Sequence, residues 1–498
     1  MKIPKEIIEI LEKLEAAKHE AWLVGGCVRD LLLERKIDDW DLATSAKPEE
    51  ITAVFPDSKY ENEFGTVLVK LPEEKRKAAG IKAVEITTFR REAKYTDKRH
   101  PDKVEFTDKL EDDLARRDFT VNAMALQVKS EELKVKSKSR EPESCYEIID
   151  LFGGRDDLDK KIIRAVGEPE KRFGEDALRM IRAVRFAAQL GFEIEEKTQA
   201  AIKKNAKWLE KISQERLRTE LEKIISSDNA ERGIRDLQEA GLLKFVIPEL
   251  EEGVGVTQNR HHIYTVFEHN VRSLGFAAQK KFSFVVRLAA LLHDIGKVQT
   301  KQGEGIEATF YNHEQAGARQ ARQILERLRF PKEIVGKVSH LIRYHMFVYD
   351  VGTVSEAGVR RLVRRIKPEN LDESFDLRVA DRLGSGVPKA VPYKLRHLRY
   401  MMERVAKDPI SVKMLKVNGH DIMSTLGVAP GPKVGAILDV LLAEVIEDPK
   451  RNTKKYLAPR VRELDKENLE KLREMAKEVI EEKREKEDEE IKRKYWVK

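Results

Sequence analysis

Cysteine is nearly absent from this sequence, since only Cys27 and Cys145 occur among its 498 residues. A disulfide scaffold and a zinc site built from several thiolates are both excluded, because each needs more cysteines than that. Long apolar runs are missing as well. The best candidate, VGAILDVLLAEVI, is interrupted by Asp439 and Glu444 and falls short of the ~18 apolar residues of a membrane-spanning helix.

The N-terminal segment MKIPKEIIEILEKLEAAKHE is amphipathic and lacks the unbroken apolar core of a secretory signal. We therefore expect a cytoplasmic protein without a membrane partner. Charged residues are abundant at 37%, and hydrophobic residues at 41% suffice to build cores. The formal net charge of +7 is compatible with a polyanionic partner but does not establish one.

Periodic patterns divide the chain into two regions. Apolar or alternating segments predict strands over 21–24, 39–42, 66–71 and 83–89, and helices are expected over 1–20, 28–35 and 113–126. The polar stretch 94–106 is expected to be a loop. From about residue 168 onward nearly every segment has helical periodicity. The fold class predicted is therefore an α/β head followed by a mostly α-helical remainder.

The segment LVGGCVRDLLLERKIDDWDLAT (23–44) carries the strongest signal for chemistry. Gly25 and Gly26 stand between a strand and a helix, where glycine lets backbone N–H groups approach a phosphate, and Arg29 lies in the first helical turn. On a strand, Asp39 and Asp41 would share one face and could hold one or two Mg²⁺ ions. Trp40 would point the other way, into the core.

This segment resembles the signature of the DNA polymerase β superfamily of nucleotidyltransferases. More narrowly, it resembles the bacterial-type class II tRNA nucleotidyltransferases, or CCA-adding enzymes, and the related bacterial poly(A) polymerases. The resemblance implies a polymerase β-like head in which Gly26 and Arg29 contact the triphosphate and Asp39 and Asp41 bind catalytic Mg²⁺. Whether Glu85 is a third carboxylate stays open, because a surface glutamate is an equally good interpretation.

Further motifs extend the resemblance. The segment RRDFTVNA (116–123) matches the family, which implies that Arg117 binds nucleotide and that Asp118 and Asn122 lie near the sugar. The loop 94–106 corresponds to the loop used in switching from C to A addition. The segment DLFGGRDDL (150–158) corresponds to the hinge between head and neck, with Leu151 where proline is usual. The segment 417–438 is similar to the C-terminal body.

The segment FGEDALRMIRAVRF (173–186) is predicted to be one helix. Asp176 and Arg179 would then lie side by side and offer fixed acceptors and donors to the edge of a base. An isolated pair at this spacing is usually a weak surface salt bridge. The resemblance implies instead that this is the nucleotide-selection motif, and that Arg182 and Arg185 contact the nucleotide or the primer phosphates.

A second constellation of metal-binding residue types follows the neck. His293 and Asp294 end the apolar run LAALLHD, and other histidines and an aspartate lie on either side. Imidazole and carboxylate ligands suit a divalent transition metal, with water as a remaining ligand. The order resembles HD-domain metal-dependent phosphohydrolases, which implies an Mn, Ni, Co or Fe site. Its core ligands would be His269, His293, Asp294 and Asp381, with His313 and His345 as further ligands and His262 and His340 as ordinary surface histidines.

These features predict five segments: a nucleotidyltransferase head (1–147), a neck for nucleotide selection and RNA binding (148–228), a helical body containing the HD domain (229–385), a helical C-terminal body (386–460) and a charged helical tail (461–498). The expected function is template-independent addition of C, C and A to the 3′ end of tRNA from CTP and ATP, with an HD phosphohydrolase activity. The oligomeric state stays open.

Two alternatives to this function are kept. Within the same class, the chain could be a poly(A) polymerase or an enzyme that adds only CC or only A. In another class, it could be an HD phosphohydrolase whose head binds RNA without catalysis. The intact Asp39 and Asp41 argue against that second alternative.

Overall fold

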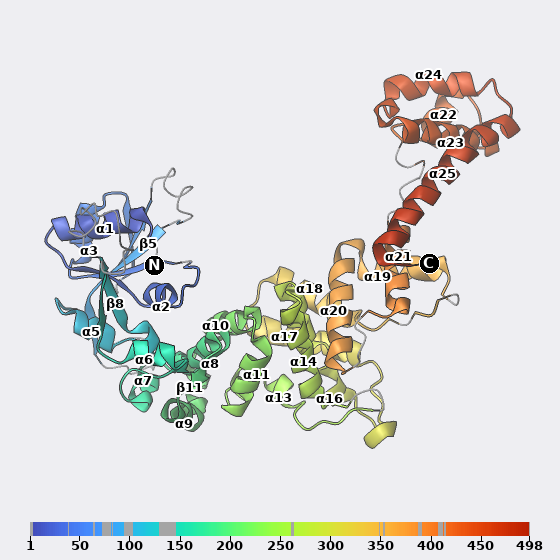
Figure 1. Cartoon of the computed structure of the whole chain (residues 1–498). Helices are drawn as coiled ribbons and strands as arrows, with labels where there is room; N and C mark the ends of the chain where they lie inside the picture. The colour runs from blue at the N-terminus through green and yellow to red at the C-terminus, as the bar shows by residue number, and fades with distance from the viewer. Residues whose placement is uncertain are drawn as a thin grey trace, which may run out of the picture. The chain divides into compact units, whose positions relative to one another are not determined.

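The computed structural model describes residues 3–37, 39–62, 65–71, 81, 83–93, 103–128, 146–259, 263–347, 349–351, 354–386, 391–406, 412 and 415–497. The chain forms two compact units (Figure 1). The first comprises Met1–Ile342 with Gly384–Gly386, and the second comprises Arg343–Leu383 with Val387–Lys498. Within the described ranges, no helix has both the length and the apolar character to cross a membrane. The five-segment division stays a prediction.

The N-terminal part of the first unit is a mixed seven-stranded sheet with the order β3-β4-β5-β2-β1-β8-β9. Strand β2 runs parallel to β5 and antiparallel to β1. Helices flank the sheet (Figure 1), and its core includes Trp22, Phe89 and Leu114. The bounds are α1 (Lys5–Ala16), β1 (Ala21–Val24), α2 (Gly26–Leu32), β2 (Asp41–Thr44), α3 (Pro48–Val54), β3 (Ser58–Asn62), β4 (Thr66–Lys70), β5 (Ala83–Thr88), β8 (Met124–Val128) and β9 (Tyr146–Asp150).

The helix predicted over 113–126 is wrong. Helix α5 (Leu110–Ala115) stops early, a 3₁₀ turn covers Thr120–Asn122, and the chain then enters β8 between β1 and β9. Most of β8 is buried, and the periodicity of a short buried strand does not distinguish it from a buried helix.

Two smaller differences concern the strands. Strand β2 begins at Asp41 rather than at Asp39. Residues 103–106 of the expected loop form β7 (Lys103–Phe106), which pairs with β6 (Arg90–Ala93). The rest of that loop, 94–102, lies outside the described residues.

The remainder of the first unit is almost entirely helical, which confirms an α/β head followed by a helical chain. A short parallel pair, β10 (Ile162–Ile163) with β11 (Glu193–Ile194), interrupts the helices. The helices are α6 (Gly154–Asp159), α7 (Pro169–Glu175), α8 (Leu178–Leu190), α9 (Glu196–Asn205), α10 (Gln214–Ser226), α11 (Ala230–Glu239), α12 (Leu243–Val246), α13 (Pro248–Glu251), α14 (Val266–Gln279), α15 (Phe284–Leu292), α16 (Gly296–Thr300), α17 (His313–Arg327) and α18 (Lys332–Arg343).

A buried arginine joins α15 to the end of α10. Nη1 of Arg287 lies 3.2, 2.9 and 3.0 Å from the carbonyl oxygens of Ile225, Ser226 and Ser227. The last carbonyls of a helix have no partner within the helix. Arg287 therefore completes the hydrogen bonding of a helix that ends about sixty residues earlier in the chain.

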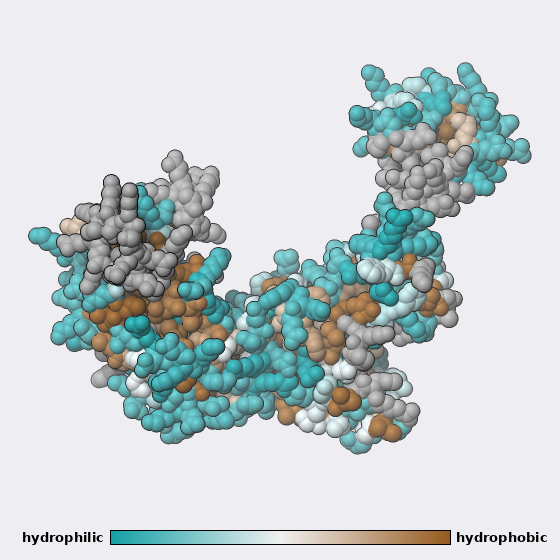
Figure 2. Space-filling view, in the orientation of Figure 1, coloured by the Kyte–Doolittle hydropathy of each residue, from teal (hydrophilic) through white to brown (hydrophobic). Residues whose placement is uncertain are grey.

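The second unit is also helical. It contains α19 (Glu356–Ile366), most of α20 (Leu371–Gly384), α21 (Tyr393–Ala406), α22 (Gly419–Leu426), α23 (Pro432–Glu447), α24 (Lys454–Leu464) and α25 (Leu469–Tyr495). Helices α22–α25 share one apolar cluster that includes Ile437, Leu457 and Leu472. Near its end, α25 is joined to α21 by an ion pair between Lys494 and Glu403. Hydrophilic residues cover most of the visible face of the helical segments (Figure 2).

Candidate active centres

The turn between β1 and α2 requires glycine. Gly25 has a φ of +76°, and a Cβ added there would lie 2.7 Å from Nη1 of Arg117 and 3.7 Å from Oδ2 of Asp41. A side chain would therefore be strained and would clash. The turn holds the start of α2 against one arginine and one carboxylate of the head.

Two carboxylates share one face of the sheet beside this turn. Asp41 is the register partner of Glu85 on the parallel strand β5, and paired residues of neighbouring strands point to the same face. Both line a pocket of about 350 Å³. Asp39 is exposed just before β2, and Trp40 is buried, as expected.

Burial raises the pKa of Asp41, and the nearby Asp39 charge adds to the effect while Arg117 opposes it. Carboxylate oxygens are the ligands that Mg²⁺ prefers, and a cation would favour their charged form. The residues thus fit a divalent hard cation.

The buried Asp113 fixes the orientation of Arg117. The Asp113 carboxylate is fully buried and accepts hydrogen bonds from Arg116 at 2.6 Å and from Arg117 at 3.0 Å. Burial alone would raise the pKa of Asp113, but the two guanidinium groups more than offset it, so the pKa is lowered. The charged Asp113 carboxylate therefore orients Arg117 toward the glycine turn.

Asp118, Asn122 and Arg29 form a second buried network. Asp118 accepts hydrogen bonds from Nε of Arg182 at 2.8 Å and from Nδ2 of Asn122 at 3.3 Å. Arg29 donates to Oδ1 of Asn122 at 2.7 Å and also pairs with Asp30. Gly26 lies in the same helix as Arg29. Side chains predicted to contact triphosphate and sugar are thus connected to one another.

The neck places Asp176 and Arg179 differently from the prediction. Helix α7 ends at Glu175 and α8 starts at Leu178, so 173–186 is not one helix. The Asp176 carboxylate accepts a hydrogen bond from the Leu178 N–H at 3.0 Å, and this local bond competes with a continuous helix.

Asp176 and Arg179 each have a different partner. Asp176 forms a bidentate pair with Arg216 of α10, at 3.2 and 2.6 Å. Arg179 pairs with Glu175 at 2.9 Å and donates to the Arg116 carbonyl at 3.1 Å. Asp176, Arg179 and Arg216 all line the pocket that contains Asp41.

Arg182 and Arg185 complete this part of the neck. Arg182 lines the pocket and bonds Asp118, whereas Arg185 pairs with buried Glu220 at 3.0 Å. The Arg185 guanidinium lies 3.9 Å from the centroid of the Phe186 ring. Burial, assisted by the Arg182 charge, lowers the pKa of Arg185 to about 10. Both arginines remain cationic at neutral pH.

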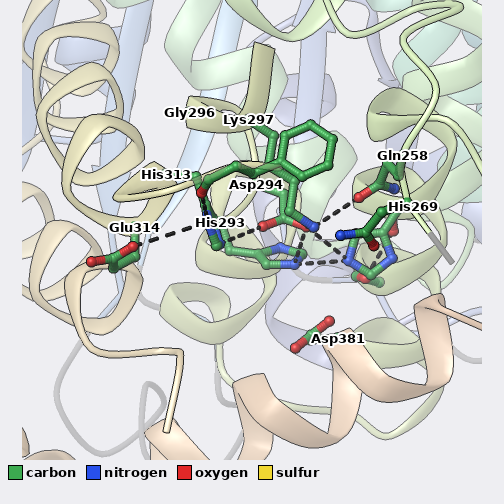
Figure 3. Close-up of polar contacts among 12 residues, drawn as sticks. Gln258, His269, His293, Asp294, Gly296, Lys297, His313, Glu314 and Asp381 are labelled. Carbon is green, nitrogen blue, oxygen red and sulfur yellow. Dashed lines mark hydrogen bonds and ion pairs between the residues drawn. The ribbon is translucent and has the colours of Figure 1, made fainter. Parts of the chain in front are cut away.

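A second centre lies among α14, α15 and α17 of the first unit (Figure 3). His269 Nε2 lies 2.9 Å from His293 Nε2 and 3.2 Å from Asp294 Oδ2. His293 Nε2 lies 3.4 Å from the same oxygen, and His313 Nε2 lies 3.5 Å from Asp294 Oδ1. Atoms bound to one ion at ~2.1 Å lie ~3.0–3.4 Å apart. His269, His293 and Asp294 therefore have the spacing of metal ligands.

Backbone contacts orient two of these imidazoles. Nδ1 of His293 lies 2.9 Å from the Ala290 carbonyl, and Nδ1 of His313 lies 2.8 Å from the Phe310 carbonyl. A carbonyl can only accept, so each neutral ring carries its proton on Nδ1 and directs the lone pair of Nε2 toward Asp294. This is the tautomer that a metal ligand needs.

Asp294 is buried next to a buried lysine. Nζ of Lys297 lies 2.6 Å from Oδ2 of Asp294 and donates to Oε1 of Gln258 at 2.7 Å. Burial would raise the pKa of Asp294, but the Lys297 charge, with a hydrogen bond from His269, holds it well below its usual range. The carboxylate is therefore charged, as metal binding requires.

Asp381 and His345 belong to the second unit and are buried there. Asp381, on α20, pairs with Arg378 at 2.5 Å. His340 is half-buried on α18, and His262 lies outside the described residues.

Four family models match successive parts of the chain. They describe the poly A polymerase head domain (21–164), an RNA- and SrmB-binding site of polymerase A (191–253), the HD domain (266–385) and domain 2 of tRNA nucleotidyltransferases (394–461). The CCA-adding enzyme of Limosilactobacillus reuteri (strain DSM 20016) is 33% identical over 460 residues, which cover 92% of this chain and 96% of that protein. The chain belongs to the family of CCA-adding enzymes.

Other similarities agree. The CCA-adding enzyme of Geobacillus stearothermophilus is 32% identical over 463 residues, covering 92% and 96% of the two chains. A crystal structure of the Bacillus stearothermophilus CCA-adding enzyme in complex with CTP is 30% identical, with a TM-score of 0.56 and coverage of 94% and 98%. The Thermotoga maritima CCA-adding enzyme complexed with tRNA shares the fold at 21% identity, with a TM-score of 0.53 and coverage of 93% and 96%.

The chain is therefore a nucleotidyltransferase of tRNA processing that carries an HD domain. Of the predicted head and neck residues, the structure brings Asp41, Arg117, Asp176, Arg179 and Arg182 to one pocket. Sequence reasoning missed Arg216 and Asp113. Arg216 lies in helix α10, which is rich in charged residues. Glu220, one helical turn later, is buried, and the spacing of these two residues is the only sign that Arg216 lies near a buried face.

Proposed function

We propose that this chain adds C, C and A to the 3′ end of tRNA, using CTP and ATP and releasing pyrophosphate. The observation that carries the proposal is the single pocket that joins Asp41 to Asp176, Arg179 and Arg216. Similarity to the CTP complex of the Bacillus enzyme supports the nucleotide, and membership of the family supports the primer.

The pocket residues divide the work of the reaction. The tRNA 3′-oxygen forms a bond to the α-phosphorus as the bond to pyrophosphate breaks, and the hydroxyl proton leaves to solvent. Asp39 and Asp41 would hold Mg²⁺, which stabilises the attacking and leaving oxygens. Arg117, already oriented by Asp113, is placed to bind the triphosphate, with Gly26 and Arg29 at the start of α2. The role of Glu85 as a third carboxylate is part of the same proposal.

Base choice follows from the donors and acceptors of the neck. Cytosine and adenine both present an amino group beside an unprotonated ring nitrogen, whereas uracil and guanine present a carbonyl beside an N–H. A carboxylate that accepts and a guanidinium that donates therefore match C and A alone. Asp176 can keep its bond to Arg216 and still accept from a base, because a carboxylate has about four acceptor sites.

The test offers the full-length protein a tRNA transcript that ends before CCA, with CTP, ATP or both, and measures product length. We expect CC with CTP alone and CCA with both nucleotides. Repeated A addition would indicate a poly(A) polymerase, and a product that stops at CC with both nucleotides would indicate a partial enzyme. Asp41→Ala should lower the rate by several orders of magnitude, while Asp159→Ala, at an exposed aspartate of α6, should not.

We infer further that the HD domain is a metal-dependent phosphohydrolase. His269, His293, Asp294 and Asp381 would hold Mn, Ni, Co or Fe, with His313 and His345 at a second ion. All six residues fall within the segment 266–385 that matches the HD model. Gly384, one turn after Asp381, supports this ligand set, since a Cβ there would lie 3.1 Å from the carbonyl oxygen of His269.

The ligand geometry suits hydrolysis of phosphate esters. A divalent ion held by these residues would lower the pKa of a bound water to near neutral. Hydrolysis of a 3′-phosphate by water would break the P–O bond and leave inorganic phosphate and a 3′-hydroxyl, and hydrolysis of a 2′,3′-cyclic phosphate would open the ring to a monoester. A 3′-hydroxyl is the group that the head extends, so hydrolysis would prepare damaged RNA ends for addition.

Hydrolysis is tested with cyclic nucleotides and phosphomonoesters in the presence of Mn²⁺, Ni²⁺, Co²⁺ or Mg²⁺. Asp294→Ala should abolish hydrolysis and spare nucleotide addition, whereas Asp41→Ala should do the reverse. If no metal supports hydrolysis, or if Asp294→Ala leaves hydrolysis and metal content intact, the phosphohydrolase proposal is wrong.

A further inference from the structure

The HD centre, formed by His269, His293, Asp294 and His313, contains a cation supplied by the protein itself. Lys297 lies on α16, three residues after Asp294, and is 6% exposed. Its Nζ lies 2.6 Å from Oδ2 of Asp294 (Figure 3). The same oxygen lies 3.2 Å from Nε2 of His269 and 3.4 Å from Nε2 of His293. An ammonium group therefore binds the oxygen that faces the two imidazoles.

Two further contacts fix the position of this ammonium group. Nζ of Lys297 donates to Oε1 of Gln258 at 2.7 Å, and it lies 5.7 Å from the centroid of the Phe310 ring, within the range of a cation–π contact. Nε2 of Gln258 donates to the carbonyl oxygens of Tyr264 and Thr265 at 3.1 and 3.3 Å. Because the amide nitrogen is bonded to these carbonyls, the amide oxygen is directed at the lysine. The ammonium group is therefore held in place by more than its ion pair.

The buried carboxylate of Asp294 requires a counter-charge. Asp294 is 2% exposed, and a buried charge is costly unless it is paired. The neutral ring of His293 carries its proton on Nδ1, so it offers Asp294 a lone pair rather than a charge. Lys297 supplies positive charge. A divalent metal on Oδ2 would supply it to the same atom, so Lys297 and a metal would be alternative counter-ions of Asp294.

A metal ion and the Lys297 ammonium group would repel each other at this oxygen. A carboxylate oxygen has two lone pairs and could bind both. With a metal–oxygen distance of about 2.1 Å, the ion would lie no more than about 4.7 Å from Nζ. Two positive charges at that separation repel strongly in a place that excludes water. Metal binding therefore either displaces Lys297 from Asp294 or takes place against its charge.

We propose that Lys297 is an internal counter-ion of Asp294 that competes with the metal and so weakens the hold of the HD centre on it. The inference rests on the metal site of the proposed phosphohydrolase and adds a means of regulating that site. Because Lys297 compensates Asp294, the HD centre stays folded in a chelator, and its loading depends on the concentration of free metal. A residue that only orients metal ligands has the opposite effect, since its loss typically weakens metal binding by about 10- to 100-fold.

The test compares Lys297→Met with the wild type, both as full-length proteins treated with a chelator. Methionine is unbranched like lysine and carries no charge. Both proteins are titrated with MnCl₂ and with NiCl₂ in a calorimeter, and binding that is lost in Asp294→Ala is assigned to the HD centre. We expect Lys297→Met to bind metal on the order of tenfold more tightly, because the repulsion is removed. Lys332→Met, at an exposed lysine of α18, should bind metal as the wild type does.

Thermal unfolding supplies a second readout. In chelator, Lys297→Met should melt at a lower temperature than the wild type, because Asp294 loses its counter-charge. Saturating Mn²⁺ should remove most of that difference. The double variant with Lys297→Met and Asp294→Asn lacks both charges and should melt above Lys297→Met in chelator. A double variant that melts no higher than Lys297→Met would overturn the counter-ion role, and this comparison still decides if Lys297→Met folds poorly.

The outcomes separate this inference from the proposed function. If the wild type shows Asp294-dependent metal binding and Lys297→Met binds metal equally or more weakly, the competition is overturned and the metal site stands. Equal metal binding by the wild type and Asp294→Ala would overturn the metal site and the competition together. Tighter metal binding by Lys297→Met, without hydrolysis by any metal form, would support the competition and remove the phosphohydrolase.

Discussion

At the scale of single residues, ion pairs fix the positions of several charged side chains in the head and neck. Asp113 fixes Arg117, Asp118 fixes Arg182, and Arg216 fixes Asp176. Each pair is at least partly buried, where removing one partner leaves the other uncompensated. A residue that never touches a nucleotide can therefore control one that does.

Arg216 is expected to be a positioning residue for base choice. Replacing Arg216 with alanine removes its two hydrogen bonds to Asp176. Loss of hydrogen bonds to a charged partner costs about 1.5–3 kcal/mol of free energy. Arg216→Ala should lower kcat/KM for CTP and ATP roughly 10- to 100-fold and reduce discrimination against UTP and GTP. Steady-state kinetics with all four nucleotides measure both effects.

The control for that change is Arg322→Ala, at an exposed arginine of α17 that pairs with exposed Glu326 one helical turn later. It should leave the kinetics unchanged. Partial recovery of selectivity in Arg216→Lys would show that charge alone positions Asp176 in part. A variant that loses stability but keeps full selectivity would contradict the positioning role.

Asp236 on α11 predicts a pH dependence of stability. Burial, reinforced by Glu239 and Glu193 and opposed by Arg232, raises its pKa to about 6. The folded state then holds the proton more tightly than the unfolded state, so the favourable contribution is complete below the unfolded pKa of 3.8 and is lost as pH rises through 6.

Asp236→Asn mimics the protonated form and should stabilise the protein at pH 8. We expect about 1 kcal/mol, a value reduced for partial solvent screening. Urea unfolding at pH 8 and at about pH 4.5 measures the difference, which should shrink at the lower pH. A stabilisation of equal size at both pH values would contradict the assignment.

At the scale of elements, the second centre depends on how closely two helices approach. Gly296, the first residue of α16, lies against the start of α17, and a Cβ there would meet the His313 carbonyl oxygen at 2.3 Å and the Gly317 nitrogen at 2.4 Å. Both are backbone atoms, which cannot rotate away. The contact fixes His313 relative to Asp294 two residues before Gly296.

Gly296→Ala should therefore push α17 away and disturb the HD centre. We expect lower thermal stability by several kcal/mol and weaker binding of Mn²⁺ or Ni²⁺ in calorimetry. Gly336→Ala on α18 is the matched control, because a Cβ there meets nothing within 4 Å. That variant should be neutral or more stable by up to about 1 kcal/mol. Equal behaviour of the two variants would contradict the packing argument.

Elements with a regular pattern could be predicted from the sequence, and those defined by their neighbours could not. The strand 21–24 and the helical remainder have local periodicity that survives folding. The helix predicted over 113–126 includes the first residues of β8 (124–126), because the burial of this strand between β1 and β9 is a property of the sheet. The break at Asp176 has a local cause, a side-chain bond to Leu178, but strong helical periodicity on both sides hides it.

The site residues divide in the same way. Asp41 and Arg117 stand in motifs and could be named from the sequence. Arg216 could not be named from the sequence, because its role depends on contact with Asp176, which lies 40 residues earlier in the chain. Ion pairs between distant helices depend on tertiary packing, and no spacing rule for one helix encodes them.

At the scale of the whole molecule, one chain holds two sets of ligands of different chemical hardness. The head offers carboxylate oxygens at Asp39, Asp41 and Glu85, and the HD centre offers imidazoles at His269 and His293. Oxygen ligands suit Mg²⁺ and imidazoles suit transition metals. The two proposed reactions would therefore be expected to differ in the metal that supports each of them best.

The bonds from Arg287 to the end of α10 have a consequence for synthesis on the ribosome. Helix α10 of the neck emerges first, and its last carbonyl groups lack their hydrogen-bond donor until Arg287 is translated, 60 residues after Ser227. At roughly 5–20 residues per second, that interval lasts about 3–12 s. During those seconds the nascent neck has an unfinished C-terminal end. The neck helix α10 thus completes its C-terminal hydrogen bonds only when the first helices of the HD domain have left the exit tunnel.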